Sequence, residues 1–308
     1  MNIIYRRKYG TAVLGKIMRW FHEREGLFET KHIASAPQNT NVPLGVTRGS
    51  HEHIVFLYFI TSIMYRDESA RTFRGICDLW KKYPEVFTKN MPDKETLSGL
   101  IKGVGLGYHN DKARNWHGCG ETLYGEFRGD PREMFSFKSV DAFVAWKKKR
   151  RNNGRAFLPG FGPKTYSLLN LFFAEVGAVS EMVDAIPVDR HIMRQFLSWK
   201  IVEGNGVHDA ASVMAEKIRK ELAVFCKTHG ERPANISHAL WLLGTHLCRH
   251  CPQIKGIEHL CPAHEICGGK VHIALYQKRG QWNMDDQKID ARHPQTAFPF
   301  DVGSFLRK

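Results

Sequence analysis

The sequence contains no hydrophobic run long enough to span a bilayer and no internal repeat at solenoid period. Its most apolar stretch, residues 54–64, is interrupted by Thr61 and Ser62 and is typical of a buried helix. The N-terminal residues MNIIYRRKYG have no apolar segment behind their charges, so no secretory signal is expected. We therefore expect no membrane attachment and a reducing compartment: the cytoplasm or nucleoid, or the nucleus in a eukaryote. The protein is also expected to be a monomer.

Acidic residues are scarce relative to basic ones. The 308 residues include 31 Asp and Glu against 45 Lys and Arg, a formal net charge of +14. This balance excludes an acidic disordered scaffold and favours a polyanionic partner such as nucleic acid. The content of 43% hydrophobic and 25% charged residues is that of a globular chain, and its length predicts about two domains.

Alternating strand patterns are also scarce, whereas apolar residues recur at helical spacing along most of the chain. The pattern weakens after about residue 270, so 271–308 are expected to form an extended C-terminal extension. The sequence therefore predicts an all-α protein. The expected helices are 54–64, 70–83, 111–127, 140–151, 165–176, 210–227 and 236–247.

The stretch FLPGFGPKTYSLLNLFF (residues 157–173) joins a basic helix to an apolar one through Gly160 and Gly162. Two glycines one residue apart allow a tight turn and let backbone N–H groups approach another surface. A phosphate is attracted to such a turn at a helix N-terminus, and the preceding run KKKRR (147–151) adds positive charge. The alternative interpretations are an ordinary turn between helices and a solvated basic face.

Lys164 follows this turn, and helical spacing places it on the same face as Leu168 and Leu171. Burial on an apolar face lowers the pKa of a lysine and yields the neutral amine that a nucleophile requires. The alternative is a lysine at the start of a helix whose amine extends to solvent.

Four motifs occur in order between about residues 50 and 270: KGVGLGYHNDKARN (102–115), LPGFGPKT (158–165), IPVDRHIMR (186–194) and HALWLLGTHLC (238–248). Together they resemble the helix-hairpin-helix DNA glycosylases, the superfamily of endonuclease III, the adenine glycosylase and 8-oxoguanine glycosylase. The resemblance implies two helical domains, 49–187 and 1–48 plus 188–270, with the active site between them. It also implies that a damaged or modified base is excised from duplex DNA.

In the bifunctional members of this superfamily, a lysine after the hairpin glycines attacks the sugar and an aspartate stabilises the developing charge. The matching positions are Lys164 and Asp189, the latter followed by His191. Asp184 lies nearer the usual spacing from the lysine but lacks the following histidine. Tyr166 departs from the superfamily, which has a small residue there.

The resemblance also implies a set of DNA contacts. Met64 stands where the superfamily has a glutamine that fills the gap left by the flipped base, so the opposite-base preference is open. Tyr108 or Leu106 would enter the duplex as a wedge. The remaining expected contacts are Gly160, Gly162, Thr165, Lys148 and Arg151.

The cysteines are unevenly distributed: four lie within 20 residues, at Cys248-x2-Cys251-x9-Cys261-x5-Cys267, and three are scattered over the other 288. In a reducing compartment, such a cluster indicates a metal site. The resemblance implies a [4Fe–4S] cluster held by the four thiolates, although the first two intervals differ from the family spacing. Zinc is the alternative, because Cys261-x2-His264 also permits a Cys3His site.

Two other functions remain open from the residues alone. In a non-catalytic DNA-binding protein, the hairpin would be a phosphate clamp and Asp189 a helix cap. In a zinc-stabilised regulator, the basic helices would bind DNA or RNA.

Overall fold

The computed structural model of the chain describes residues 3–65, 67–150, 157–204, 211–248, 251, 256–268, 274–278 and 281–285. The predicted all-α fold is confirmed, because helices dominate these residues. Strands among them form two antiparallel pairs, β1 (Ile3–Tyr5) with β2 (Val202–Gly204) and β3 (Ala274–Lys278) with β4 (Gln281–Asp285). No helix in the described part of the chain is both long and apolar enough to cross a membrane.

The chain divides into two compact units. The central unit comprises 32–187 and 232–234, and the terminal unit comprises the described residues of 1–31, 188–231 and 235–285. The chain passes from the terminal unit to the central unit at 31/32 and returns at 187/188. The domain bounds 49–187 and 1–48 plus 188–270 stay a prediction.

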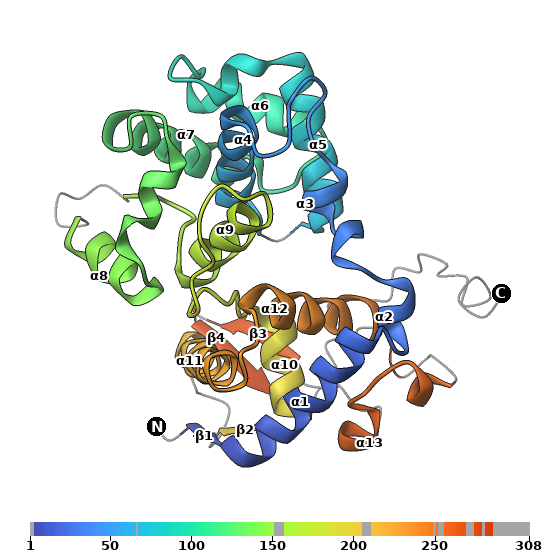
Figure 1. The fold of residues 1–308 in the computed structure, drawn as a ribbon. Coiled ribbons are helices and arrows are strands. Elements are labelled where there is room, and N and C mark those ends of the chain that lie inside the picture. The colour runs from blue at the N-terminus through green and yellow to red at the C-terminus, as the bar shows by residue number, and fades with distance from the viewer. Residues whose placement is uncertain are drawn as a thin grey trace. The chain divides into compact units, whose positions relative to one another are not determined.

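The central unit contains helices α3 to α9 (Figure 1). Most were expected from the apolar spacing, but α3 and α6 were not. The bounds are α3 Pro37–Thr40, α4 His51–Ser62, α5 Ser69–Lys82, α6 Lys94–Gly103, α7 His109–Glu126, α8 Val140–Arg150 and α9 Pro163–Glu175. Short 3-10 turns at Ile33–Ser35, Pro84–Phe87 and Pro131–Phe137 connect them.

Helix α4 is the core of the central unit. Every residue from His53 to Ser62 is buried, because α4 is apolar all round and packs against α5, α7 and α9 (Figure 1). Ser50 begins the helix by accepting a hydrogen bond from the backbone N–H of His53, at 3.3 Å. Aromatic rings surround the helix, including Trp116, which stacks on Phe59 with ring centroids 4.8 Å apart. This rigid core supports the loops at the ends of α4, α6 and α8.

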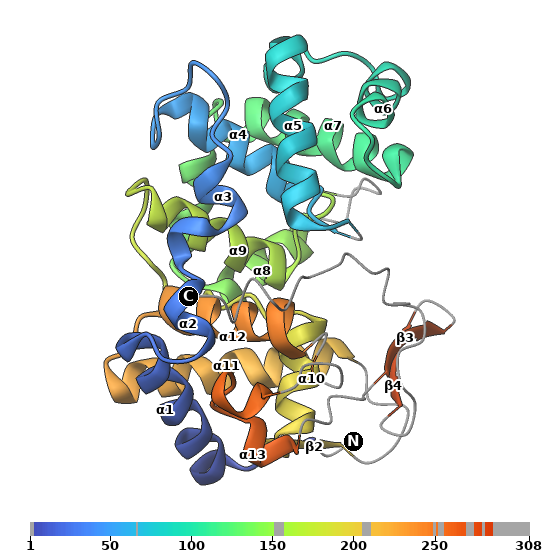
Figure 2. The same ribbon diagram turned by 90° about the vertical axis from the view of Figure 1, so that its right-hand side faces the viewer.

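The terminal unit contains α1 and α2, then α10 to α13. Its bounds are α1 Arg7–Glu23, α2 Leu27–Thr30, α10 Arg190–Ser198, α11 Ala211–His229, α12 Pro233–Leu242 and α13 His264–Cys267. Helix α12 passes into a π-helix, Leu243–Cys248, and a 3-10 turn covers Ile257–His259. Residues 271–308 were expected to form an extended tail, but β3 and β4, which lie within this range, form an antiparallel hairpin (Figure 2).

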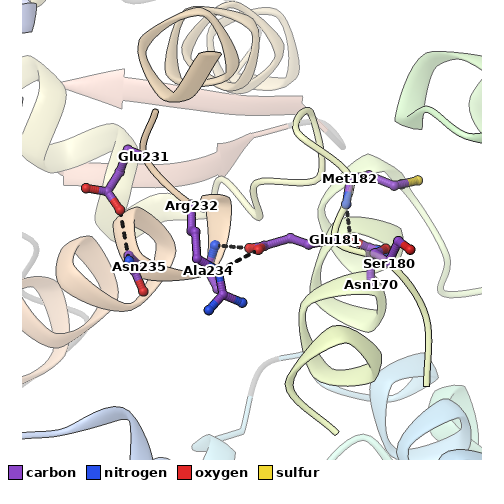
Figure 3. A network of polar contacts seen from close by, with 8 residues as sticks. All are labelled: Asn170, Ser180, Glu181, Met182, Glu231, Arg232, Ala234 and Asn235. Atoms are coloured by element: carbon purple, nitrogen blue, oxygen red, sulfur yellow. Dashed lines mark hydrogen bonds and ion pairs between the residues drawn. The ribbon is translucent and has the colours of Figure 1, made fainter. Parts of the chain in front are cut away.

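A connector, residues 176–187, follows α9 and is held by side-chain hydrogen bonds (Figure 3). Asn170 donates to the Ser180 carbonyl at 3.2 Å and accepts from the Met182 N–H at 3.0 Å. Glu181 accepts a hydrogen bond from the N–H of Ala234, in the first turn of α12, and pairs with Arg232, just before α12, at 3.1 Å. Both of these partners belong to the central unit.

Candidate nucleic-acid interface

The turn after α8 is fixed by Gly160. This residue has φ +85°, and a Cβ there would lie 2.3 Å from the Ser62 carbonyl oxygen at the end of α4. Leu158 also has positive φ and is fully buried. Gly162 is different: its φ is −106°, and a Cβ would meet nothing within 4 Å. Gly160 is thus required by packing against α4, whereas Gly162 lies beside open space.

The basic run before the turn has divided roles. The Lys147 ammonium donates to the carbonyl oxygens of Leu158, at 2.7 Å, and Phe161, so it braces the turn from within. Arg150 is bound to Glu126 at 2.8 Å. Of the expected DNA contacts, Lys148 is exposed on α8 and Arg151 lies outside the described residues. Less of this charge is therefore presented to solvent than the sequence suggests.

The N-terminus of α9 has the features of an anion site. Gly162 is its N-cap, Pro163 occupies its first turn, and no side chain caps it. The first N–H groups of a helix have no carbonyl partner within the helix. The backbone amides of Lys164 and Thr165 are such groups, and Thr165 is half-buried. An oxyanion would satisfy them and would also interact favourably with the helix dipole.

The Lys164 side chain is exposed. Leu171 is buried and Leu168 is partly buried against the core. Lys164, the second residue of α9, does not share their burial. Of the two interpretations of Lys164, the one in which its amine extends to solvent therefore agrees with the structure of the central unit. Tyr166 is fully buried, stacks on Phe143 with centroids 3.9 Å apart and donates to the Met134 carbonyl. The larger residue after the hairpin thus ties α9 to α8.

Two further loops lie on the same unit. Met64, in the loop between α4 and α5, is partly buried and packs against the core. In the loop between α6 and α7, Tyr108 is 52% exposed and adopts a left-handed conformation, φ +53°. Leu106 is only 2% exposed and packs beside Gly75 of α5. Of the two expected wedges, Tyr108 is the one whose side chain faces solvent, whereas Leu106 belongs to the core.

Asp189 belongs to the terminal unit and is the N-cap of α10. Its Oδ1 accepts from the N–H groups of His191, at 2.8 Å, and Ile192, at 3.1 Å. Asp184 belongs to the central unit, where its Oδ2 accepts from the N–H of Val140 at 2.9 Å, at the start of α8. Lys164 and Asp184 thus belong to the central unit and Asp189 to the terminal unit, and each aspartate accepts hydrogen bonds at a helix N-terminus.

Endonuclease III is structurally similar to this chain. In a non-covalent complex with DNA, it matches with a TM-score of 0.51 and 17% sequence identity, over 84% of this chain and 96% of that one. The chain has the fold of endonuclease III. The enzyme trapped as a covalent DNA intermediate, in the estranged-adenine complex, gives 0.49 at 16% identity over 85% and 99%. No protein-family model and no curated protein sequence matches the chain.

The endonuclease III fold here places four cysteines in the terminal unit. Cys248 ends the π-helix, Cys251 and Cys261 are 6% and 7% exposed, and Cys267 ends α13. Gly244 allows the π-helix to approach α10, because a Cβ there would lie 2.9 Å from the Cβ of His191. Within the described residues, no three His, Cys, Asp or Glu side chains stand close enough to hold one ion.

The thiols nevertheless influence one another. Burial raises the pKa of Cys261 to about 12, with further increases from Cys267 and Cys251. Burial also raises the pKa of Cys251 to about 11, and Cys267 again contributes. The pKa of Cys248 is raised mainly by burial and then by the other three, while a hydrogen bond from Gln195 at 3.6 Å opposes it. Neighbouring thiols therefore add to the raised pKa values of Cys248, Cys251 and Cys261, and a cation beside these three would relieve the cost of ionising them.

A buried ion pair was not anticipated from the sequence. Lys112, inside the GLGYHNDKA motif, is fully buried and contacts Asp67, whose side chain is 10% exposed. Desolvation lowers the pKa of Lys112, and its hydrogen bond to Asp67 opposes this. The period-3.6 pattern gives a partial signal, because it places Lys112 beside apolar Ala113 and Trp116, but no local signal pairs it with Asp67, 45 residues earlier.

Proposed function

We propose that the protein is a bifunctional DNA glycosylase/AP lyase that excises an oxidised or otherwise modified base from duplex DNA. The observation that carries the proposal is the position of Lys164: an exposed amine in the first turn of α9, directly after a glycine turn with an uncapped helix N-terminus, in a chain with the endonuclease III fold. A backbone phosphate on this N-terminus would place the neighbouring sugar near the amine.

The proposed reaction follows from amine chemistry. The flipped nucleotide presents its anomeric carbon to Lys164 Nζ, which forms a C–N bond while the glycosidic bond breaks and the base leaves with the electron pair. Ring opening gives an imine between Nζ and the sugar. Loss of a proton from the adjacent carbon then expels the 3′ phosphate. Hydrolysis of the imine releases the sugar remnant and restores the lysine.

Asp189 would stabilise the positive charge that develops on the sugar and accept the proton released by the lysine. Asp189 also has a structural role, because its Oδ1 caps the N-terminus of α10. The same cap is what a non-catalytic DNA-binding protein would use, and that is the alternative function. A substitution that retains the cap but removes the charge separates the two.

We further propose that Cys248, Cys251, Cys261 and Cys267 ligate a [4Fe–4S] cluster, with structural zinc as the alternative. Support comes from the donor set, four buried or partly buried free thiols, and from the effect of neighbouring thiols on the pKa values of Cys248, Cys251 and Cys261. Four thiolates are the usual ligand set of such a cluster. When bound, it would fix the loop after α12. It would take no part in base removal.

The decisive experiment is borohydride trapping with duplexes carrying thymine glycol, 8-oxoguanine, uracil or an abasic site against each opposite base. The wild type should form a covalent adduct with at least one of them. Lys164→Gln should abolish the adduct and strand cleavage while leaving DNA affinity within about threefold, the effect of one lost phosphate charge. Lys149→Gln, which removes an exposed lysine of α8, is the matched control. Undiminished trapping in Lys164→Gln would refute the assignment.

A further inference from the structure

The buried ion pair joins two loops of the central unit. Lys112 lies in the first turn of α7, and its N–H donates to the Tyr108 carbonyl at 3.0 Å. Asp67 lies in the loop between α4 and α5, three residues after Met64. A Cβ on Gly107 would lie 3.4 Å from an Asp67 carboxylate oxygen, so the α6–α7 loop runs directly over this carboxylate.

Additional contacts strengthen the connection. The Lys112 ammonium lies over the Tyr65 ring, 5.5 Å from its centroid, and Asn115 donates to the Tyr65 hydroxyl at 3.4 Å. The side chain of Asn115 is also 3.1 Å from the position that a Cβ of Gly160 would occupy. Contacts therefore run from the α6–α7 loop through the α4–α5 loop to the hairpin turn.

Stability alone gives little reason for such a pair. Burying two charges has a large desolvation cost, and apolar residues of similar volume are often as stable or more so. What a buried pair supplies is a fixed geometry, since either charge left alone is strongly unfavourable. Here the pair joins the loop that ends at exposed Tyr108 to the loop that contains partly buried Met64.

We propose that Lys112 and Asp67 are positioning residues that hold the Tyr108 loop and the Met64 loop at a fixed separation, so that both enter the duplex together during base extrusion. This inference rests on the proposed function. Neither residue contacts the reacting atoms. The pair acts before the chemical step, by holding two neighbouring base steps open while the target nucleotide leaves the stack.

Two sets of variants test the proposal. Lys112→Met/Asp67→Leu removes both charges without leaving either one alone. Asp67→Asn, which keeps an acceptor for the lysine but removes the opposite charge, is an independent second variant. Arg132→Met, which removes a surface pair with Asp130 in the same unit, is the matched control. Circular dichroism and thermal melting establish that each protein is folded.

The principal measurement is the fluorescence of 2-aminopurine placed beside an abasic-site analogue in a duplex. The wild type should raise it on binding, because the neighbouring step is unstacked. Asp67→Asn and the double variant should lose most of this rise, and single-turnover excision should fall roughly tenfold or more, since small misplacements are costly to rate. Strand cleavage at a preformed abasic site, which has no base to extrude, should fall less than excision does.

The possible outcomes separate the positioning role of the pair from the lyase chemistry. Folded pair variants with the wild-type fluorescence rise and excision rate would overturn the inference, as would a wild type that produces no rise at all. A wild type that produces the rise but forms no borohydride adduct would refute the lyase chemistry while leaving the positioning role supported. Loss of the rise in Arg132→Met as well would also count against a specific role for the pair.

Discussion

Replacing Gly160 by alanine should destabilise the central unit, whereas the same change at Gly162 should not. At Gly160, the left-handed φ of +85° costs an L-residue roughly 1–2 kcal/mol. The new Cβ would also lie 2.3 Å from the Ser62 carbonyl oxygen, a backbone atom that can move only with α4. Overpacking of this kind costs roughly 1–3 kcal/mol, so the sum is about 3 kcal/mol.

At Gly162, the φ of −106° suits alanine and the Cβ meets nothing within 4 Å. The loss of a glycine N-cap and the lower entropy of the unfolded chain oppose each other, so stability should change by less than about 1 kcal/mol. The new methyl group would instead stand beside the uncapped amides of α9, where a phosphate is proposed to bind. Its effect should therefore appear in DNA affinity.

Thermal denaturation and fluorescence anisotropy with a short undamaged duplex separate the two effects. Gly160→Ala should lower the Tm of the central unit by roughly 6–12 °C, at a few degrees per kcal/mol for a unit of this size. Gly162→Ala should keep the wild-type Tm and bind the duplex several-fold more weakly. An unchanged Tm in Gly160→Ala, or a destabilised Gly162→Ala, would show that the division between a structural and a ligand-facing glycine is wrong.

Three further predictions follow from the other sites. Asp189→Asn should retain the α10 cap and the wild-type Tm but lose base excision, whereas Asp189→Ala should also lose about 1 kcal/mol of stability. Equal excision by Asp189→Asn and the wild type would show that Asp189 is only a helix cap, and a wild type without any excision would favour the non-catalytic alternative. Cys261→Ser should lose bound iron and visible absorbance while Cys77→Ser retains both, and stoichiometric zinc in a colourless wild type would rule out the cluster. Burial lowers the pKa of His53 to about 4 from an ordinary value near 6.5. Between these pH values the unfolded chain binds more protons than the folded one, so the free energy of unfolding should fall as the pH is lowered from 6.5 to 4. His53→Gln should flatten the dependence of Tm on pH in this range.

Much of this protein is determined by local sequence. Apolar spacing predicts the helices of the central unit because a helix buries a face that recurs every 3.6 residues. The segment before Met64 is apolar on all sides, and it is the buried central helix α4. The hairpin glycines, Lys164 and the four clustered cysteines are also visible without coordinates, since residue type and spacing alone carry those signals.

Other properties were decided only by the tertiary structure, because they depend on residues distant in the chain. The two hairpin glycines look alike in sequence. Gly160 alone has a left-handed φ and lies against the carbonyl of Ser62, some hundred residues earlier, and the folded chain decides both features. Lys147 reads as a surface cation but turns inward to two carbonyls. The pairing of Lys112 with Asp67 requires α4, α5 and α7 to be packed first, and no local pattern encodes a long-range contact of that kind.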